Sequence, residues 1–312
     1  MKKVVLTVTL AYLAAIPAVG TTPPATFQAG EVVVASANYA CAIDPPPAPD
    51  FGIALHSRNA AKIRDVSSEV ISAVTYAWRA VYVARTYATN AQSIDLLTPP
   101  GGLFPLVALP AGRYVTAMTP YRGDLLAVVY DGASPELWRI NQVGVSIDRV
   151  ALPQPTHYIS SIDVSADRCT VFYATVDSVE RFDMCTRRSL ARFAQLYAID
   201  VRVLPDGGVL VAGGTQMTRF DATGNVAGRF AVTTGSEGIG ALALDQNPSV
   251  AWIVTTFGCS SGVARVMQVN LATGSIIAGP ASTSRAGGFA IAVQGEWHAA
   301  IEGVPARRRA VH

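Results

Sequence analysis

This sequence has little charge, few histidines and almost no helical patterning. Charged residues make up 15% of its 312 residues and the formal net charge is +2, so we expect no broad basic surface for nucleic acid. The four histidines are isolated from one another, with no H-x-x-H or H-E pair: His56, His157, His298 and His312. Chemistry that depends on a histidine-bound metal therefore has weak support.

Several catalytic and cofactor motifs are also absent. The chain has no P-loop, no dinucleotide-binding fingerprint, no G-x-S-x-G and no C-x-x-C. The glycines of "GSEGIG" (235–240) precede a predicted strand, whereas a phosphate-binding loop would begin a helix. The "ATG" turns of "DATGN" and "LATGS" lack the following Trp that quinone-dependent dehydrogenase repeats carry. The sequence therefore gives no support to these enzyme classes.

The N-terminus has the pattern of a secretory signal peptide. Three residues, Met1, Lys2 and Lys3, make a basic start, and residues 4–19 are apolar and uncharged. The apolar run of ~16 residues is shorter than the ~20 that a spanning helix needs, and the small residue Gly20 precedes a polar linker. We predict cleavage after residue 20, export to the periplasm or the medium, no membrane span after cleavage, and a compartment where disulfides persist.

What the chain does contain is turns and short apolar segments. Hydrophobic residues make up 50% of it, with 26 Gly and 19 Pro. Val-, Ala-, Leu- and Tyr-rich segments between Gly, Pro, Asp and Asn predict short strands. Only residues 58–74 could pass for an amphipathic helix. Residues 44–66 are predicted to be a Pro-rich excursion on one face, because "DPPPAPDFGIALHS" has too many prolines for a strand ladder.

One element recurs along the chain, an apolar strand after a polar turn. Its copies are predicted at residues 30–37, 78–85, 123–130, 168–175, 207–214, 249–256 and 295–302. A second strand follows four of these copies and closes on an Asp or Asn, a residue type that starts turns by bonding nearby backbone groups. These turn formers are Asn141, Asp183, Asp221 and Asn270.

A third strand then returns, and a fourth precedes each repeat. Leu106, Arg149 and Arg192, which mark the third strand, stand 43 residues apart. Four short strands in each unit of about 40 residues are typical of a propeller, in which small sheets pack radially. The sequence predicts an all-β fold, a β-propeller of six or seven four-stranded blades over 21–303, with a basic tail at 304–312. The competing folds are a β-sandwich, which does not require this recurring order, and a β-helix, which would repeat about every 20 residues or fewer, a period that the sequence does not show.

The strands at 30–35 and 287–293 are predicted to pair and close the ring. Cys41 and Cys259 each follow a copy of the first strand, so both are expected in loops on one face. If their blades adjoin, these two cysteines can form a disulfide, although spacing alone does not fix the pairing.

Cys169 and Cys185 stand at the two ends of a predicted strand–turn–strand, "RCTVFYATVDSVERFDMC". A hairpin folded about Asp177 places Cys169 opposite Cys185 and Phe172 opposite Phe182. Facing residues on antiparallel strands lie about 4.5–5.5 Å apart at Cα, within reach of a disulfide. We therefore predict a Cys169–Cys185 disulfide across one blade, and an aromatic pair inside it.

The stretch "CTVFYATVDSVERFDMCTRRSLARF", followed by "YAIDVRVLPDGGVLVAGG" and "RFDATGNVAGRF", resembles exported bacterial β-propellers of the NHL-like and streptogramin-lyase-like group. The resemblance spans about residues 115–275. It implies a propeller fold and no single activity, because the group includes enzymes and binding proteins. A lyase of this kind would need a metal-assisted histidine at the central channel, and His157 lies just ahead of a predicted inner strand.

A gluconolactonase-like activity would need calcium held by acids from several inner strands. The candidate ligands are Asp163, Asp200 and Asp245, each within or just after such a strand. The same acids fit as turn formers, and we favour that interpretation.

Two functions remain open. The sequence favours a non-enzymatic exported module that binds a protein, glycan or small ligand on one face or in the channel, without a cofactor. The alternative is a propeller hydrolase or lyase with Ca²⁺ or Mg²⁺ in the central channel.

Overall fold

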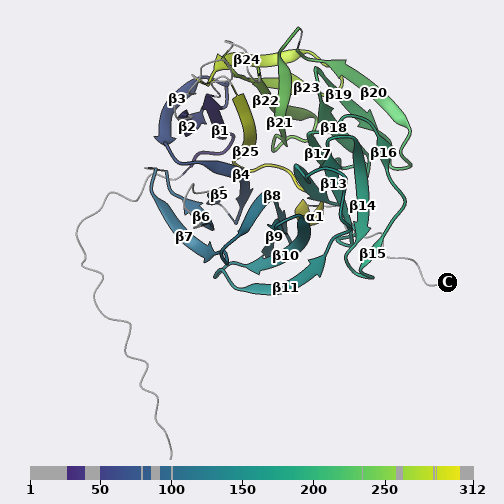
Figure 1. Cartoon of the computed structure of the whole chain (residues 1–312). Helices are drawn as coiled ribbons and strands as arrows, with labels where there is room; N and C mark the ends of the chain where they lie inside the picture. Colours follow the sequence, from purple (N-terminus) through teal and green to yellow (C-terminus); the bar gives the residue numbers. More distant parts are fainter. Residues whose placement is uncertain are drawn as a thin grey trace, which may run out of the picture.

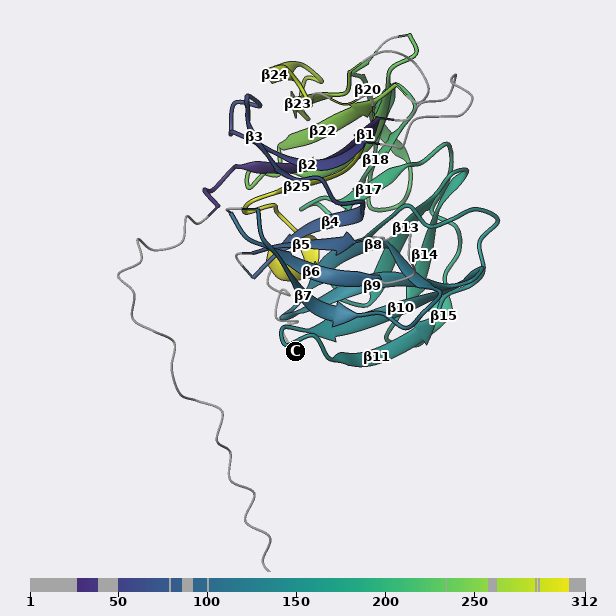
Figure 2. The same cartoon turned by 60° about the vertical axis from the view of Figure 1, so that its left-hand side comes forward.

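The computed structural model describes residues 27–38, 50–78, 80–85, 92–99, 101–233, 235–257, 263–283, 285 and 287–302. Within these residues the chain forms 25 strands and one short helix, α1 (Ala299–Glu302). The architecture is all-β, with sheets arranged around a common axis like the blades of a propeller (Figures 1 and 2). Among the described residues, no helix has the length and apolar character needed to span a membrane.

Three sheets are four-stranded meanders in chain order, as the four-strand repeat predicts. The first contains β4 (Ile71–Ala77), β5 (Ala80–Arg85), β6 (Ser93–Leu97) and β7 (Leu103–Ala108). The second contains β8 (Arg113–Tyr121), β9 (Asp124–Asp131), β10 (Ser134–Asn141) and β11 (Ser146–Ala151). The third contains β17 (Asp200–Val203), β18 (Val209–Gly213), β19 (Gln216–Phe220) and β20 (Val226–Ala231).

Two further sheets have extra strands. One contains β12 (Ser161–Val164), β13 (Thr170–Thr175), β14 (Ser178–Asp183) and a broken outer edge of β15 (Arg188–Ser189) and β16 (Ala194–Gln195). The other has eight strands: β21 (Gly238–Leu244), β22 (Val250–Thr256), β23 (Arg265–Asn270), β24 (Ile276–Ser282), β25 (Gly287–Val293), β1 (Val32–Asn38), β2 (Asp50–His56) and β3 (Lys62–Ser67). Its halves, β21–β24 and β25–β3, are joined by the single pair Thr256–Gly287.

Six inner strands surround the axis. β4 contacts β8, β8 contacts β12, β12 contacts β17, β17 contacts β21, β21 contacts β25, and β25 contacts β4. β12 and β17 run in the same direction, because their contacts advance together along both strands: Ser161 bonds to Asp200, and Asp163, two residues further on, accepts the N–H of Val203. Buried Val, Ile, Leu and Ala fill the space between the sheets.

The strands predicted to close the ring do pair. β1 lies antiparallel to β25, with Val32 opposite Val293 and Val34 opposite Ile291. All four side chains are almost completely buried. The first and last strands of the described chain therefore belong to the same sheet.

Three assignments made from the sequence were wrong. The predicted excursion at 44–66 contains β2 and most of β3, and β2 pairs with β1 over its whole length. The prolines end at Pro49, and the apolar segment after them has ordinary strand composition. The possible helix at 58–74 is β3 and the start of β4. The last predicted strand, 295–302, is a loop that ends in α1.

The turn formers act as predicted. The Asp183 carboxylate accepts the N–H groups of Cys185 and Thr186 at 2.9 and 3.0 Å. Asp221 accepts the N–H groups of Thr223 and Asn225, both at 2.9 Å. Asn141 and Asn270 make the corresponding bonds in their own turns. Each side chain thus satisfies backbone donors that the strand ends would leave unpaired.

The Cys169–Cys185 disulfide is present, with the Cα atoms 5.2 Å apart. The predicted register, however, was wrong by one residue. Thr175 pairs with Ser178 across a two-residue turn, so Val171 faces Phe182. A one-residue shift sends side chains to opposite faces, and Phe172 packs edge-to-face on Phe193 at 5.2 Å instead. Cys41 and Cys259 lie outside the described residues.

Candidate functional site

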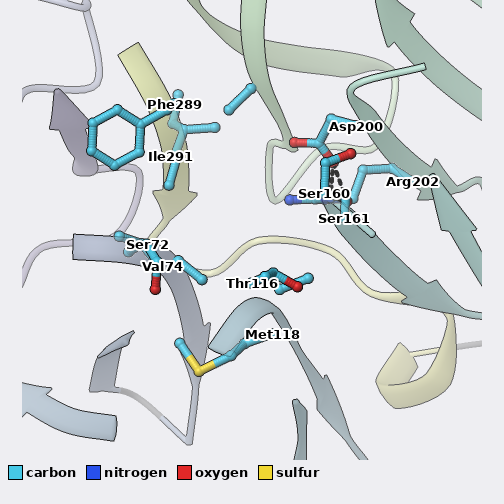
Figure 3. Close-up of a pocket in the computed structure, with 14 residues that line it drawn as sticks. Ser72, Val74, Thr116, Met118, Ser160, Ser161, Asp200, Arg202, Phe289 and Ile291 are labelled. Atoms are coloured by element: carbon cyan, nitrogen blue, oxygen red, sulfur yellow. Dashed lines mark hydrogen bonds and ion pairs between the residues drawn. The ribbon is translucent and has the colours of Figure 1, made fainter. Parts of the chain in front are cut away.

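A narrow cavity lies on the axis of the ring, near the start of the inner strands (Figure 3). All six inner strands or the residues leading into them contribute to its lining, which includes Ser72, Thr116, Ser161, Asp200, Ala241 and Ile291. Its volume is about 40 Å³. A water molecule needs roughly 10–15 Å³ by this measure, so the cavity has room for a few waters and not for a sugar or an organic cofactor.

A buried arginine occupies the channel next to this cavity. The Arg202 guanidinium contacts Asp200 Oδ1 at 2.5 Å through Nη1 and Glu296 Oε1 at 2.9 Å through Nε. His298 lies between two carboxylates, with Nδ1 3.6 Å from Asp163 and Nε2 3.6 Å from Glu296. All five side chains are at least 90% buried. Three acids, one arginine and one histidine thus form one buried cluster, which we call the channel cluster.

The ionisation of the channel cluster follows from these contacts. Burial disfavours the charged form of Arg202, but Asp200 and Glu296 outweigh burial and raise the pKa of Arg202 above its ordinary value. Burial likewise favours a neutral Asp163, yet His298, Arg202 and the N–H of Val203 lower the pKa of Asp163. Arg202 is therefore a permanent cation inside the channel, held between the carboxyl groups of Asp200 and Glu296.

Asp163 and Asp200 each join two neighbouring inner strands. Asp163, on β12, accepts the N–H of Val203 on β17 at 2.8 Å. Asp200, on β17, accepts the N–H of Leu242 on β21 at 2.8 Å. Each also accepts the N–H of the residue that follows it. The turn-forming role predicted for these two acids was therefore wrong: they bridge adjacent sheets.

Asp245, the third candidate ligand, does form a turn. Its Oδ1 accepts the N–H of Asn247 at 3.1 Å. Its Oδ2 accepts bonds from Trp252 Nε1 at 2.8 Å and Gln268 Nε2 at 3.1 Å, both on the next strands of the same sheet. Within the described part of the chain, Asp245 thus shares no hydrogen-bond partner with Asp163 or Asp200. The three acids do not form one set of metal ligands.

The carboxylates of the channel cluster do not fit a divalent cation. Calcium takes six to eight oxygen ligands and magnesium six. Both oxygens of Asp163 and both oxygens of Asp200 already accept hydrogen bonds from protein donors. A metal ion there would also lie against the Arg202 guanidinium, and two cations in one buried site repel strongly.

The C-terminal segment, residues 294–302, closes the other end of the channel. It leaves β25 and carries Glu296 and His298 into the channel cluster. Trp297 is 7% exposed, and the Ala300 carbonyl accepts a bond from Arg168 Nε at 3.0 Å. Figure 1 shows α1 inside the outline of the ring, and α1 contacts β8. We call this end the back face and the opposite end the front face.

The other histidines lie elsewhere. His157 is exposed on the front face, in the segment between β11 and β12, and lines a surface hollow outside the channel. His157 lies just ahead of the inner strand β12, as predicted, and is a solvated loop residue rather than a channel residue. His56 is buried, with Nδ1 2.8 Å from the carbonyl of Ala60. His312 lies outside the described residues.

Reasoning from the sequence missed Arg202, Glu296 and His298 as partners. One signal was available, since "DVRV" places two opposite charges on the same face of a strand between apolar residues. No comparable local signal pointed to Glu296 and His298, because the pattern of "GEWHAAIE" predicts a strand rather than a segment that crosses the channel.

No protein-family model matches the chain, and no curated protein matches it. Solved structures match it in fold. A protein of unknown function from Bacteroides caccae has a TM-score of 0.64 at 13% identity, covering 85% of this chain and 98% of that one. A chain of a nidogen/laminin complex has a TM-score of 0.61 at 10% identity with the same coverage. A gluconolactonase from Xanthomonas campestris has a TM-score of 0.52 at 12% identity, covering 72% and 84%. At these identities the likeness shows the fold alone.

Proposed function

We propose that the chain is an exported six-bladed propeller that acts as a binding module rather than as a metal-dependent enzyme. The observation that carries this proposal is the channel cluster, in which Arg202 takes the place that a catalytic cation would need. The channel is closed by protein groups on its back face and leaves about 40 Å³ beside the cluster. A ligand must then bind on the outer surface, and the front face offers hollows large enough for one.

Six is the number of blades that the contacts support. Six inner strands contact one another in a closed cycle. The eight-stranded sheet divides at the single pair Thr256–Gly287 into two runs of four strands. The seventh copy expected from the sequence, residues 295–302, supplies no strand.

Export is supported by the disulfide and by the N-terminal pattern. Cys169 and Cys185 are bonded, which suits an oxidising compartment. The predicted signal peptide at residues 1–20 lies outside the described residues. Membership of the NHL-like group also stays a proposal, supported by the shared fold and the quoted motifs.

The competing function is a metal-dependent hydrolase or lyase. Because one of the structural matches is a gluconolactonase, this activity should be tested directly. We expect purified protein to contain no stoichiometric Ca²⁺ or Mg²⁺ by elemental analysis. We also expect its melting temperature to be unchanged by EDTA and no hydrolysis of a sugar lactone above the uncatalysed rate. A stoichiometric metal whose removal lowers the melting temperature, or lactone hydrolysis that EDTA abolishes, would contradict the proposal.

A further inference from the structure

The front face carries a hollow built from three separate segments. It lies between the β9–β10 turn, the β11–β12 connection and the β13–β14 turn, and its volume is about 380 Å³. This is within the range of roughly 300–1,000 Å³ typical of small-molecule sites. Its lining includes Tyr130, Gln154, Thr156, His157, Tyr158 and Val176. We call it the tyrosine pocket.

A braced aromatic ring forms one wall of the tyrosine pocket. Tyr158 stands edge-on to Tyr130, with the ring centroids 4.9 Å apart, and edge-on to Tyr114 at 6.1 Å. Tyr114 and Tyr130 stack on each other at 5.5 Å. Tyr158 nevertheless remains 58% exposed. A single exposed tyrosine is ordinary, but one held by two neighbours beside a hollow presents a fixed ring face for stacking.

The connection that carries Tyr158 is fixed at both ends. The N–H of Leu152 donates to the Pro135 carbonyl at 3.0 Å, and the N–H of Ile159 donates to Tyr130 Oη at 2.9 Å. Pro153 and Pro155 lie between them and restrict the backbone. A loop held in this way loses little conformational entropy when a ligand binds.

The tyrosine pocket offers neutral hydrogen-bonding groups to a ligand. Gln154 and Thr156 are exposed side chains that both donate and accept, His157 lies beside them, and no Asp, Glu, Lys or Arg lines the pocket among the described residues. Burial raises the pKa of Tyr130, so its hydroxyl keeps its proton while it accepts the N–H of Ile159. The combination of an aromatic face with neutral donors and acceptors matches a ligand that has apolar C–H faces and many hydroxyl groups.

We propose that the tyrosine pocket binds a neutral carbohydrate, with one sugar ring stacked on Tyr158 and its hydroxyls bonded to Gln154 and Thr156. This inference rests on the proposed binding function and names its ligand class. A second hollow of about 230 Å³ shares Gln154, Pro155 and Thr156 with the tyrosine pocket. It is bordered by the ion pair of Arg192 and Glu180, 2.6 Å apart, and planar charged groups of this kind also bond sugar hydroxyls. The site therefore fits an oligosaccharide that crosses the 154–156 loop rather than a single sugar.

The test is binding of the labelled whole protein to an array of neutral oligosaccharides, followed by titration of the best ligand. We expect micromolar to millimolar binding by the wild type, a loss of at least 10-fold for Tyr158→Ala, and a smaller loss for Thr156→Ala. Tyr197→Ala is the matched control. Tyr197 occupies the equivalent place before β17, is 53% exposed, and does not line the tyrosine pocket. We expect this variant to bind like the wild type.

Other outcomes separate this inference from the proposed function. If no oligosaccharide binds, or if Tyr158→Ala binds as well as the wild type while circular dichroism shows both proteins folded, the carbohydrate assignment is wrong. Aromatic surfaces also bind proline-rich peptides. Binding of such a peptide in place of any glycan, lost in Tyr158→Ala, would overturn the ligand class and leave the binding function standing. A stoichiometric catalytic metal would overturn the binding function itself.

Discussion

Arg202 contributes to stability by compensating charges that are already buried. Its partners Asp200 and Glu296 are almost inaccessible, and Glu296 also accepts the N–H of Leu244 at 3.2 Å. Removing one partner of a buried ion pair leaves the other charge without compensation, which costs about 3–5 kcal/mol. Replacing both members of the ion pair by apolar residues of similar size would change stability much less. The reason is that the attraction between the two charges is largely offset by the hydration that they lost on burial.

We therefore expect Arg202→Met to lower the free energy of unfolding by about 3–5 kcal/mol, measured by urea denaturation at pH 7. The control is Arg219→Met. Arg219 pairs with Asp206 on the surface, where both side chains are more than a third exposed, and such pairs contribute about 0–1 kcal/mol. Equal losses in the two variants would show that the channel cluster has no special role.

Asp221 gives a pH dependence of known sign. The Thr223 hydroxyl and the N–H of Asn225 lower the pKa of Asp221 to about 2, against roughly 3.9 in an unfolded chain. Its stabilising contribution is therefore complete above pH 4 and is lost as the pH falls through 2. Asn at this position keeps the side-chain acceptor and does not titrate.

We expect the stability advantage of the wild type over Asp221→Asn to shrink steadily between pH 4 and pH 2, measured by urea midpoints at each pH. Above pH 5 the difference between the two proteins should be constant. An advantage that grows as the pH falls would contradict the assigned direction of the pKa shift.

At the scale of elements, the β13–β14 hairpin shows how a contact can be predicted while its register is not. The disulfide depends on the ends of the hairpin, where Cys169 and Cys185 lie beyond the last strand pair, Thr170–Asp183. Their backbone N–H groups are held by Asp167 and Asp183. The predicted Phe172–Phe182 contact depended on the length of the turn, and the spacing of residues in the sequence does not determine that length to within one residue. The observed two-residue turn pairs Phe182 with Val171 instead.

The Cys169–Cys185 disulfide should stabilise the hairpin chiefly by restricting the unfolded chain. It closes a loop with a sequence separation of 16, which corresponds to about 3 kcal/mol. We expect the double variant Cys169→Ala/Cys185→Ala to unfold at lower urea concentration by about this amount, and reduction of the wild type to have the same effect. Non-reduced tryptic digests should show peptides 169–181 and 182–187 linked. Free thiols at both positions in exported protein would contradict the assignment.

The strand pattern was largely predictable, because alternating apolar residues and turn formers are local signals. Most predicted strands before residue 295 match observed ones. The channel cluster was not predictable in the same way. Arg202 and Glu296 are 94 residues apart in the chain, so their contact depends on how the blades stack rather than on any local pattern. The prediction for residues 44–66 was wrong because the prolines end at Pro49 and do not restrict the backbone of the apolar residues that follow, which form β2.

At the scale of the whole molecule, the C-terminal segment is part of the core of the ring. Trp297 packs in the same apolar cluster as strands β17 to β23, and Ala300 packs with strands β8 to β14. Glu296 and His298 complete the channel cluster from the same segment. Removing it would expose apolar surface and leave Arg202 with one carboxylate fewer.

We expect deletion of residues 294–312 to prevent folding or to lower the melting temperature by more than 10 °C, measured by calorimetry. Trp297→Ala is the milder variant, with an expected cost of about 3–5 kcal/mol. Deletion of 303–312, which removes none of the described residues, is the control and should leave the melting temperature within 2 °C of the wild type. Equal effects of the two deletions would show that the segment does not stabilise the ring.

The pairing of β1 with β25 has a consequence for the order of events during biosynthesis. β1 has apolar side chains on both faces and an unpaired edge until its partner, some 250 residues later, becomes available. Pairing between segments so distant along the chain slows folding, because the loop between them must close before the contact can form. Until then β1 keeps an exposed edge that other chains can pair with, so we expect a newly made molecule to be most prone to aggregation before its final strand has been synthesised.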